Sequence, residues 1–241
     1  MSEYKEYGVI RFYEEDHRYV NWETNEQYLS VTQLLHHYQQ EFDSDFQSKK
    51  VAKREGKTQE EILAMWKDKS DTATDYGHEI HSFFERMFLS PGRITIPSND
   101  LEQQLLQAYH KTKQLDLSGD VTPEQLVYNH EYKLAGQSDI FHFPGNNMFD
   151  VGDWKTNEKF KYYDPFKNYL KEPVEHLSQC DFNTYALQLS IYAYFYEIMS
   201  GMKCRKLFIL YYWRDHNIFQ VIPLNYLKND VKLLLEHYKN N

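Results

Sequence analysis

Two aspartates and a lysine are the residues in this sequence best suited to catalysis. Residues 134–155 form a predicted β-hairpin with a turn at 144–148, and Asp139, Asp153 and Lys155 lie at its open end. Side chains alternate along a strand, so Asp153 and Lys155 share one face, and this register places Asp139 opposite Asp153. Facing carboxylates repel each other unless a cation lies between them. Oxygen ligands at this spacing suit Mg²⁺ or Mn²⁺.

The same register makes further predictions about this hairpin. It places Phe143 opposite Phe149, Phe141 opposite Val151 and Gln137 opposite Lys155, with Trp154 on the other face. These neighbours are too apolar for a ribbon in solvent, so the charges should be partly buried and should need partners. A lysine beside metal-bound carboxylates can activate a water and stabilise negative charge, as phosphodiester hydrolysis requires. The alternative is a surface hairpin with solvated charges.

Two predicted helices carry further candidate residues. His78, His81 and Glu85 share one helical face, at positions i, i+3 and i+7. A zinc-protease helix needs two histidines four residues apart, so the spacing of three excludes that enzyme class. His81 is a metal ligand or a histidine packed between helix and sheet, and packing is favoured for His78. Gln188 and Tyr192, four residues apart, either support the site or lie at the margin of the core.

The apolar pattern predicts the elements that position these groups. A hairpin over 9–20 comes first, with Ser30 or Thr32 as the cap of the next helix. The other predicted elements are, in order, helical residues 46–89 with a break and capping box at 56–61, helix 101–115, strand 124–132, the 134–155 hairpin, a long polar connection over 158–181, helix 183–200, strands 206–213 and 218–222, and helix 224–238. This order indicates an α/β or α+β fold with one central mixed sheet.

The composition fits one intracellular domain. With 241 residues the chain can bury a core as a single unit. Its two cysteines, Cys180 and Cys204, are too few for a disulfide framework, a structural zinc site or a four-cysteine iron–sulfur cluster. The first residues, MSEYKEYG, do not resemble a signal peptide, and no apolar run is long enough to span a membrane. We therefore expect a cytoplasmic protein without membrane contact.

Nucleic acid binding would need local basic surfaces, because the net charge is −9. One basic run, 47–57, contains Lys49, Lys50, Lys53, Arg54 and Lys57. A second run, 155–171, places Lys159 and Lys161 among aromatic residues such as Tyr162. Lysines supply phosphate contacts and aromatic rings supply stacking platforms for a single strand. The alternative for the second run is a solvated flexible loop.

Four motifs in order resemble those of a known enzyme superfamily. They are Gly77…His81…Glu85, Gly136-Gln137-Ser138-Asp139, Gly152-Asp153-Trp154-Lys155 and Gln188-Leu189-Ser190-Ile191-Tyr192. The chain is similar here to the PD-(D/E)XK nucleases, in particular to the RecB-like branch with the CRISPR-adaptation nucleases, the mitochondrial genome maintenance exonuclease and many phage exonucleases. Ser138 stands where the family name has proline, which is a frequent variation.

The resemblance implies a fold and a set of residue roles. The fold would be a restriction-endonuclease-like central mixed β-sheet flanked by helices, in a single nuclease domain over 1–241. Residues 1–118 would form an N-terminal hairpin and helical cap, and 119–241 the catalytic core. His81, Asp139, Asp153 and the carbonyl of Trp154 would hold the metal ion, and Lys155 would be the catalytic lysine. Supporting or DNA-contacting roles would fall to Gln188, Tyr192, Glu85, Glu124, Lys159, Lys161 and Tyr162.

These observations lead to a functional hypothesis with three rivals. The hypothesis is a Mg²⁺- or Mn²⁺-dependent DNA exonuclease without an iron–sulfur cluster, which prefers single strands or free ends threaded under the helical cap. Its partners would be DNA and, in a phage or host setting, recombination or replication proteins. The rivals are an endonuclease on the same fold, an inactive nucleic-acid-binding protein, and a zinc metalloenzyme that uses His78 and His81.

Overall fold

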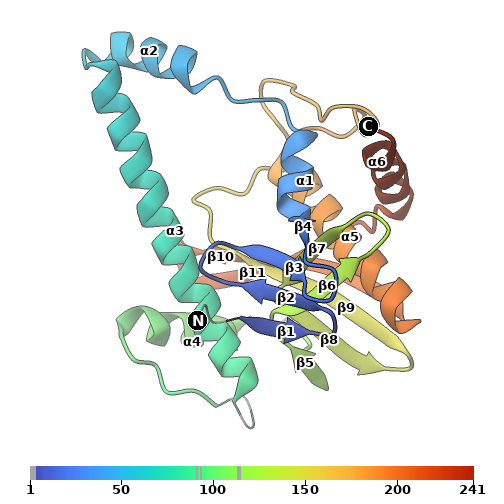
Figure 1. Cartoon of the computed structure of the whole chain (residues 1–241). Helices are drawn as coiled ribbons and strands as arrows, with labels where there is room; N and C mark the ends of the chain where they lie inside the picture. Colours follow the sequence, from blue (N-terminus) through green and yellow to red (C-terminus); the bar gives the residue numbers. More distant parts are fainter. Residues whose placement is uncertain (1–3, 91, 93, 113–114) are drawn as a thin grey trace.

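The strands form two mixed sheets that lie side by side in the computed structural model, which describes residues 4–90, 92, 94–112 and 115–241 (Figure 1). The six-stranded sheet has the order β1 (Lys5–Tyr7), β2 (Ile10–Tyr13), β3 (Arg18–Asn21), β4 (Glu26–Ser30), β7 (Leu134–Ser138) and β6 (Gln125–Asn129). The five-stranded sheet has the order β11 (Ile218–Leu224), β10 (Lys203–Trp213), β9 (Met148–Lys155), β8 (Ile140–Gly145) and β5 (Asp120–Thr122). The predicted α+β class is confirmed, but the prediction of one central sheet is wrong.

The chain passes from one sheet to the other at Asp139. β7 pairs with β6 and, in parallel, with β4, whereas β8 pairs with β9, which is itself parallel to β10. The predicted continuous strand over 134–143 therefore breaks after Ser138. The predicted pairing of Gln137 with Lys155 is wrong, because Gln137 pairs with Leu126 of β6.

The hairpin between β8 and β9 keeps most of its predicted register. Phe141 does pair with Val151, as predicted. The turn is shorter than expected and consists of Asn146 and Asn147, whose φ angles of 54° and 56° lie in the left-handed region that asparagine tolerates. Because an irregularity between His142 and Gly145 shifts the register, the predicted pairing of Phe143 with Phe149 is not formed.

Most helices begin and end close to their predicted positions, but the helix predicted over 224–238 begins only at Lys228, because Leu224 is the last residue of β11. The helices are α1 (Val31–His37), α2 (Ser44–Glu55), α3 (Gln59–Leu89), α4 (Asp100–Lys111), α5 (Asp181–Ser200) and α6 (Lys228–Asn240). Ser30 with Gln33 caps α1, and Thr58 with Glu61 forms the predicted capping box of α3. The helix predicted over 101–115 ends at Lys111, and its positions 113–114 lie outside the described residues.

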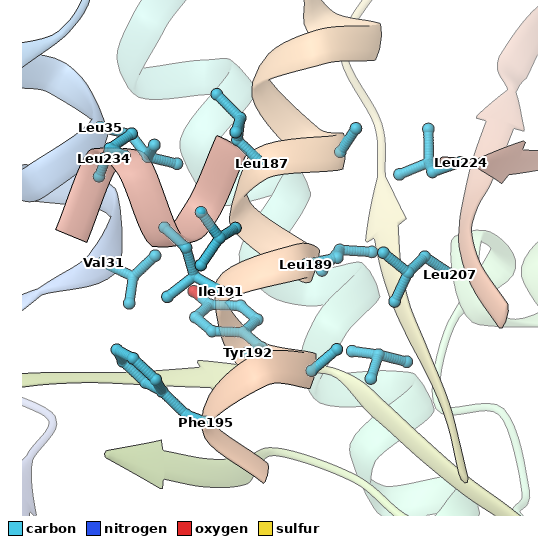
Figure 2. Close-up of a cluster of buried hydrophobic side chains, with 14 of the residues drawn as sticks. Val31, Leu35, Leu187, Leu189, Ile191, Tyr192, Phe195, Leu207, Leu224 and Leu234 are labelled. Atoms are coloured by element: carbon cyan, nitrogen blue, oxygen red, sulfur yellow. The ribbon is translucent and has the colours of Figure 1, made fainter. Parts of the chain in front are cut away.

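Apolar side chains cover both faces of the five-stranded sheet. On one face α5 packs between α1, α6 and the strands, through residues such as Leu187, Leu189 and Ile191 (Figure 2). On the other face α3 and α4 pack around Trp154, whose ring stacks on Phe84 at a centroid distance of 3.9 Å. Since alternate residues of β9 reach these two cores, the strand is fixed from both sides just before Lys155.

α2 and the first turns of α3 extend away from both sheets (Figure 1). α2 is held against α3 by Gln59, whose Nε2 donates to Asp45 Oδ1 at 2.9 Å and to Ser48 Oγ at 3.0 Å. The buried side chains Ala52 and Ile62 supply the apolar part of this contact region. None of the helices in the described part of the chain combines the length and apolar character that crossing a membrane requires.

Candidate metal centre

Three side chains from separate elements converge where β7 gives way to β8. His81 of α3, Asp139 of the β7–β8 junction and Asp153 of β9 each place one ligand atom within 4.8 Å of the others. Within the described residues this is the one such group of histidine, cysteine and acidic side chains. The apolar face of α3, which includes Ile80 and Phe84, packs in the core around Trp154 and so sets the position of His81.

Hydrogen bonds orient the carboxylate of Asp139. Its Oδ1 lies 3.1 Å from His81 Nδ1, and its Oδ2 accepts a hydrogen bond from the backbone N–H of Trp154 at 2.8 Å. Asp139 is therefore tied to β9 through backbone and to α3 through a side chain. The carbonyl oxygen of Trp154 belongs to the same strand segment, and its role as a ligand stays a prediction.

The charges of the centre are strongly coupled. Burial and the nearby charge of Asp139 raise the pKa of Asp153 to about 7, although Lys155 opposes this shift. Burial alone would lower the pKa of His81, but the Asp139 carboxylate raises it to about 9. Burial also works against ionisation of Asp139, yet His81, Asp153 and Lys155 hold its pKa below the usual range. The two carboxylates thus repel each other, and protonated His81 and Lys155 offset their charge, so a metal ion that binds here would displace the proton of His81.

Lys155 is a partly buried cation beside this group. Its Nζ lies 2.8 Å from Asp153 Oδ2 and 4.8 Å from the ring centroid of Tyr185 on α5. Burial alone would lower the pKa of Lys155, but the charge of Asp153 raises it above the usual value. Lys155 therefore carries its proton, and it is fitted to stabilise negative charge rather than to act as a base.

The centre opens onto a cleft of about 750 Å³. His81 and Lys155 form part of its wall, together with the middle of α3, the chain that follows β9, and the end of β10. Lys69 of α3 pairs with Glu158 beyond β9 at 2.7 Å, and both residues line the cleft. Aromatic side chains make up much of the remaining lining, namely Tyr76, Trp154, Tyr185, Tyr211, Tyr212 and Trp213.

The two supporting acids have different surroundings. Glu124 lies near the centre, where burial and the charge of Asp139 raise its pKa to about 8. Its backbone φ of 51° and its N–H contact with the Asp139 carbonyl, at 3.4 Å, fix it at this junction. Glu85 instead pairs with Lys5 at 3.0 Å. His78 is exposed and is not part of the group, which removes the pairing that the zinc metalloenzyme hypothesis needs.

Gln188 and Tyr192 form a buried pair on α5, with Gln188 Nε2 donating to the Tyr192 hydroxyl at 3.0 Å. Tyr192 packs against Gly136 of β7 so closely that a Cβ there would lie 2.5 Å from the ring. Both residues therefore support the β7 end of the site from within the core. Neither side chain lines the cleft, so a direct contact with DNA stays a prediction.

The basic aromatic loop lies after β9, on the surface. Lys159 and Lys161 are exposed, and Tyr162, which is 56% exposed, packs on Phe160 at a centroid distance of 4.9 Å. None of these four residues lines the cleft with His81 and Lys155. Phe160 connects the two regions, because its ring also packs on Tyr211 of the cleft at 5.6 Å.

Three residues of the cleft wall were not anticipated from the sequence. Tyr185 lies one turn before Gln188 on the same helix, so the spacing Tyr185, Gln188, Tyr192 was a usable signal. Tyr76 and Arg214 pack together, with the Arg214 Cζ 3.7 Å from the Tyr76 ring centroid. No local pattern links residues so far apart in sequence, and only the fold brings them together.

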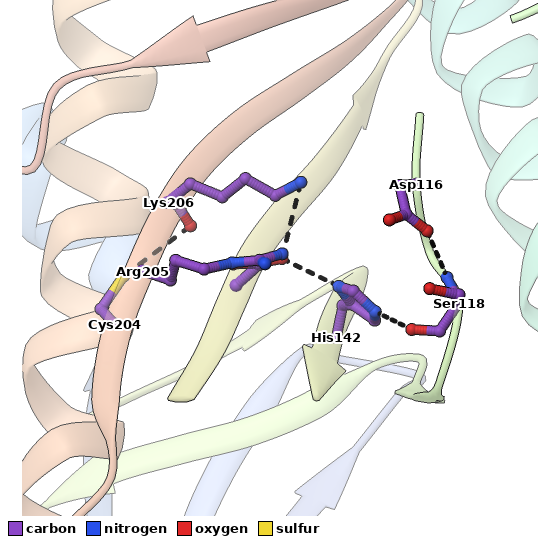
Figure 3. Close-up of polar contacts among 7 residues, drawn as sticks. Asp116, Ser118, His142, Cys204, Arg205 and Lys206 are labelled. Atoms are coloured by element: carbon purple, nitrogen blue, oxygen red, sulfur yellow. Dashed lines mark hydrogen bonds and ion pairs between the residues drawn. The ribbon is translucent and has the colours of Figure 1, made fainter. Parts of the chain in front are cut away.

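A second buried polar cluster lies elsewhere on the five-stranded sheet (Figure 3). Asp150 of β9 is fully buried and binds Arg205 Nε at 2.7 Å and His142 Nδ1 at 2.8 Å. His142 Nε2 lies 2.5 Å from the carbonyl of Ser118. Every carboxylate oxygen here has a protein partner, so this cluster fastens strands together and offers no ligand set for a metal ion.

Comparisons with known proteins give little to add to this geometry. No family model matches the sequence, and a search of curated proteins finds no match. Among 15 matching chains of solved structures is a protein from Eubacterium rectale named "Putative exonuclease". It aligns with a TM-score of 0.41 and 14% identity, over 70% of this chain and 64% of that chain. An overlap this weak does not transfer an activity to this protein.

Proposed function

We propose that the protein is a metal-dependent DNA exonuclease that hydrolyses phosphodiester bonds and prefers single strands or free ends. The observation that carries this proposal is the convergence of His81, Asp139 and Asp153 within 4.8 Å of one another, with Lys155 bound to Asp153. The same four residues are those to which the resemblance to RecB-like PD-(D/E)XK nucleases assigns catalysis. Partners in recombination or replication stay a prediction.

The donor set fits Mg²⁺ or Mn²⁺. Two carboxylates supply the oxygen ligands that these ions prefer, and the imidazole of His81 is a common additional ligand. The raised pKa of Asp153, caused by burial and by Asp139, reflects the repulsion that a divalent cation would relieve. Together these features support a divalent ion at this position.

The residues then have distinct tasks in hydrolysis. A bound ion would polarise the scissile phosphate and ease deprotonation of a water. Asp139, oriented by the Trp154 N–H, and Asp153 would hold that ion. Lys155 would orient the attacking water and stabilise the negative charge that develops on the phosphate. Tyr185, against which Lys155 lies, would keep the ammonium group in place.

The cleft supports a single-stranded substrate. Its volume of about 750 Å³ falls within the range of small-ligand sites, roughly 300–1,000 Å³. Such a space admits a short piece of a single strand. The loop that follows Lys155 adds exposed aromatic rings, Tyr163 and Phe166, and the lysines Lys159 and Lys161. Rings and lysines together suit unpaired nucleotides.

Digestion of 5′- and 3′-labelled single- and double-stranded DNA with Mg²⁺, Mn²⁺ or EDTA tests this function. We expect metal-dependent shortening of single strands, and for Lys155→Ala a loss of about 10²-fold or more in kcat with the fold intact by circular dichroism. Lys67→Ala, at an exposed position paired with Asp71, should keep full activity. Undiminished cleavage by Lys155→Ala, or cleavage in EDTA, would refute the proposal.

A further inference from the structure

Arg214 occupies a distinctive position in the cleft beside the metal centre. It follows β10 as the first residue of a short 3₁₀ turn, η2 (Arg214–His216), and lines the same cleft as His81 and Lys155. Its guanidinium carbon lies 3.7 Å from the centroid of the Tyr76 ring on α3. A guanidinium that lies over a ring in this way is restrained by it, while N–H groups of its planar fork remain able to donate.

The charge of Arg214 differs from that of the two lysines of the cleft. Lys155 is neutralised by Asp153 at 2.8 Å and Lys69 by Glu158 at 2.7 Å. Among the residues that the structure describes, no carboxylate lies within ion-pair distance of Arg214. An arginine that lies on a ring and has no ion-pair partner among the described residues offers a planar donor set of the kind that binds a phosphate through two hydrogen bonds.

We propose that Arg214, held on Tyr76, binds a backbone phosphate of the DNA strand adjacent to the phosphate that is cleaved. This inference rests on the proposed nuclease function and adds a substrate-binding residue that the four sequence motifs do not contain. The ligand chemistry is the phosphodiester of a single strand, which is the substrate proposed for this cleft. Tyr76 is a positioning residue that acts through Arg214.

Binding measurements in EDTA test Arg214 without cleavage. The probe is a fluorescent oligo-dT single strand, titrated by anisotropy at several salt concentrations. For Arg214→Gln we expect Kd to rise about tenfold. The plot of the logarithm of the association constant against the logarithm of the salt concentration has a negative slope, and we expect this slope to become less steep by about 0.7, the value for one phosphate contact on a single strand. Tyr76→Leu should show part of this loss, whereas Tyr76→Phe, which keeps the ring, should bind like the wild type.

Arg18 is a matched control for Arg214, because it also lies over a tyrosine ring but outside the cleft. Arg18 also lies over a tyrosine, 5.0 Å from the Tyr13 ring centroid, but it pairs with Asp16 and does not line the cleft. Arg18→Gln should therefore leave both Kd and the salt slope unchanged. In cleavage assays Arg214→Gln should raise KM and retain most of kcat, since the metal centre is intact.

The outcomes separate this inference from the proposed function. Unchanged Kd and salt slope in Arg214→Gln, alongside active wild-type cleavage, would overturn the inference and leave the nuclease assignment standing. A lost phosphate contact in a protein that never cleaves DNA would support the subsite and refute the function. Equal losses in Arg214→Gln and Arg18→Gln would mean that the contact is non-specific, which also overturns the inference.

Discussion

At the scale of single residues, the charges of the candidate metal centre depend on one another. Asp139 keeps its charge because His81 and Lys155 lie close, whereas Asp153 is pushed towards its neutral form by burial and by Asp139. Removing any one of these four side chains would change the charge state of the rest. Effects of double substitutions at this centre should therefore be far from additive.

Gly77 and Gly136, two glycines of the sequence motifs, should respond differently to substitution by alanine. A Cβ at Gly136 would lie 2.5 Å from the Tyr192 ring, whereas at Gly77, within α3, it would make an ordinary contact of 3.6 Å with Thr156 Oγ1. Gly136→Ala should lower the free energy of unfolding by about 1–3 kcal/mol through overpacking. Gly77→Ala should raise it by up to about 1 kcal/mol, because alanine favours the helix.

Urea denaturation at 25 °C measures both changes. The pair of variants serves as its own control, since each adds one methyl group to a motif glycine. Equal changes in the two variants would show that the close contact of Tyr192 with β7 does not limit what position 136 can hold.

At the scale of elements, locally encoded features were predictable and longer-range pairings were not. The helices were found from capping boxes and apolar stripes, and the β8–β9 register from alternation and turn residues. Asp139 and Asp153 could therefore be brought together from the sequence alone. The change from one sheet to the other at Asp139 could not be predicted from the sequence, because the chain is extended both before and after Asp139. Short strands such as β1 and β5, with three residues each, carry too little pattern to detect.

The cluster around Asp150 gives a pH-dependent prediction at the same scale, since it joins β8, β9 and β10. Burial alone would raise the pKa of Asp150, but hydrogen bonds from Arg205 and His142 lower it. Because the folded-state pKa lies below the unfolded value of about 3.9, the charge stabilises the fold above that pH. This contribution is lost as the pH falls through the folded-state pKa.

Asp150→Asn should therefore lower the free energy of unfolding by about 3 kcal/mol at pH 7. The difference from the wild type should shrink when the pH falls below about 4, where the carboxylate of the unfolded chain starts to take up a proton while that of the folded chain stays charged. Asp16→Asn, at an exposed ion pair with Arg18, is the control and should change stability by less than about 1 kcal/mol. A difference for Asp150→Asn that is constant with pH would contradict this account.

At the scale of the whole molecule, the helix that carries His81 of the candidate metal centre continues into a long extension. α2 and the first turns of α3 project beyond the sheets (Figure 1), and the middle of α3 forms one wall of the cleft. α2 carries Lys49, Lys50, Lys53 and Arg54 far from the sheets, and two of these cations are paired, Lys49 with Asp45 and Arg54 with Glu55. A strand that runs along this surface and into the cleft would meet phosphate-binding groups before it reaches Lys155.

The last prediction concerns the topology of the substrate. If a strand enters the cleft by its end, beneath the α2–α3 extension, a circular single strand has no end to enter and should resist cleavage. We expect a linear single strand to be degraded at least about tenfold faster than a circular one of the same sequence, as measured by gel electrophoresis with Mn²⁺. The circle nicked once by an unrelated nuclease is the matched control and should regain the linear rate. Equal rates on closed circles and linear strands would indicate an endonuclease, with a cleft that accepts the strand from the side.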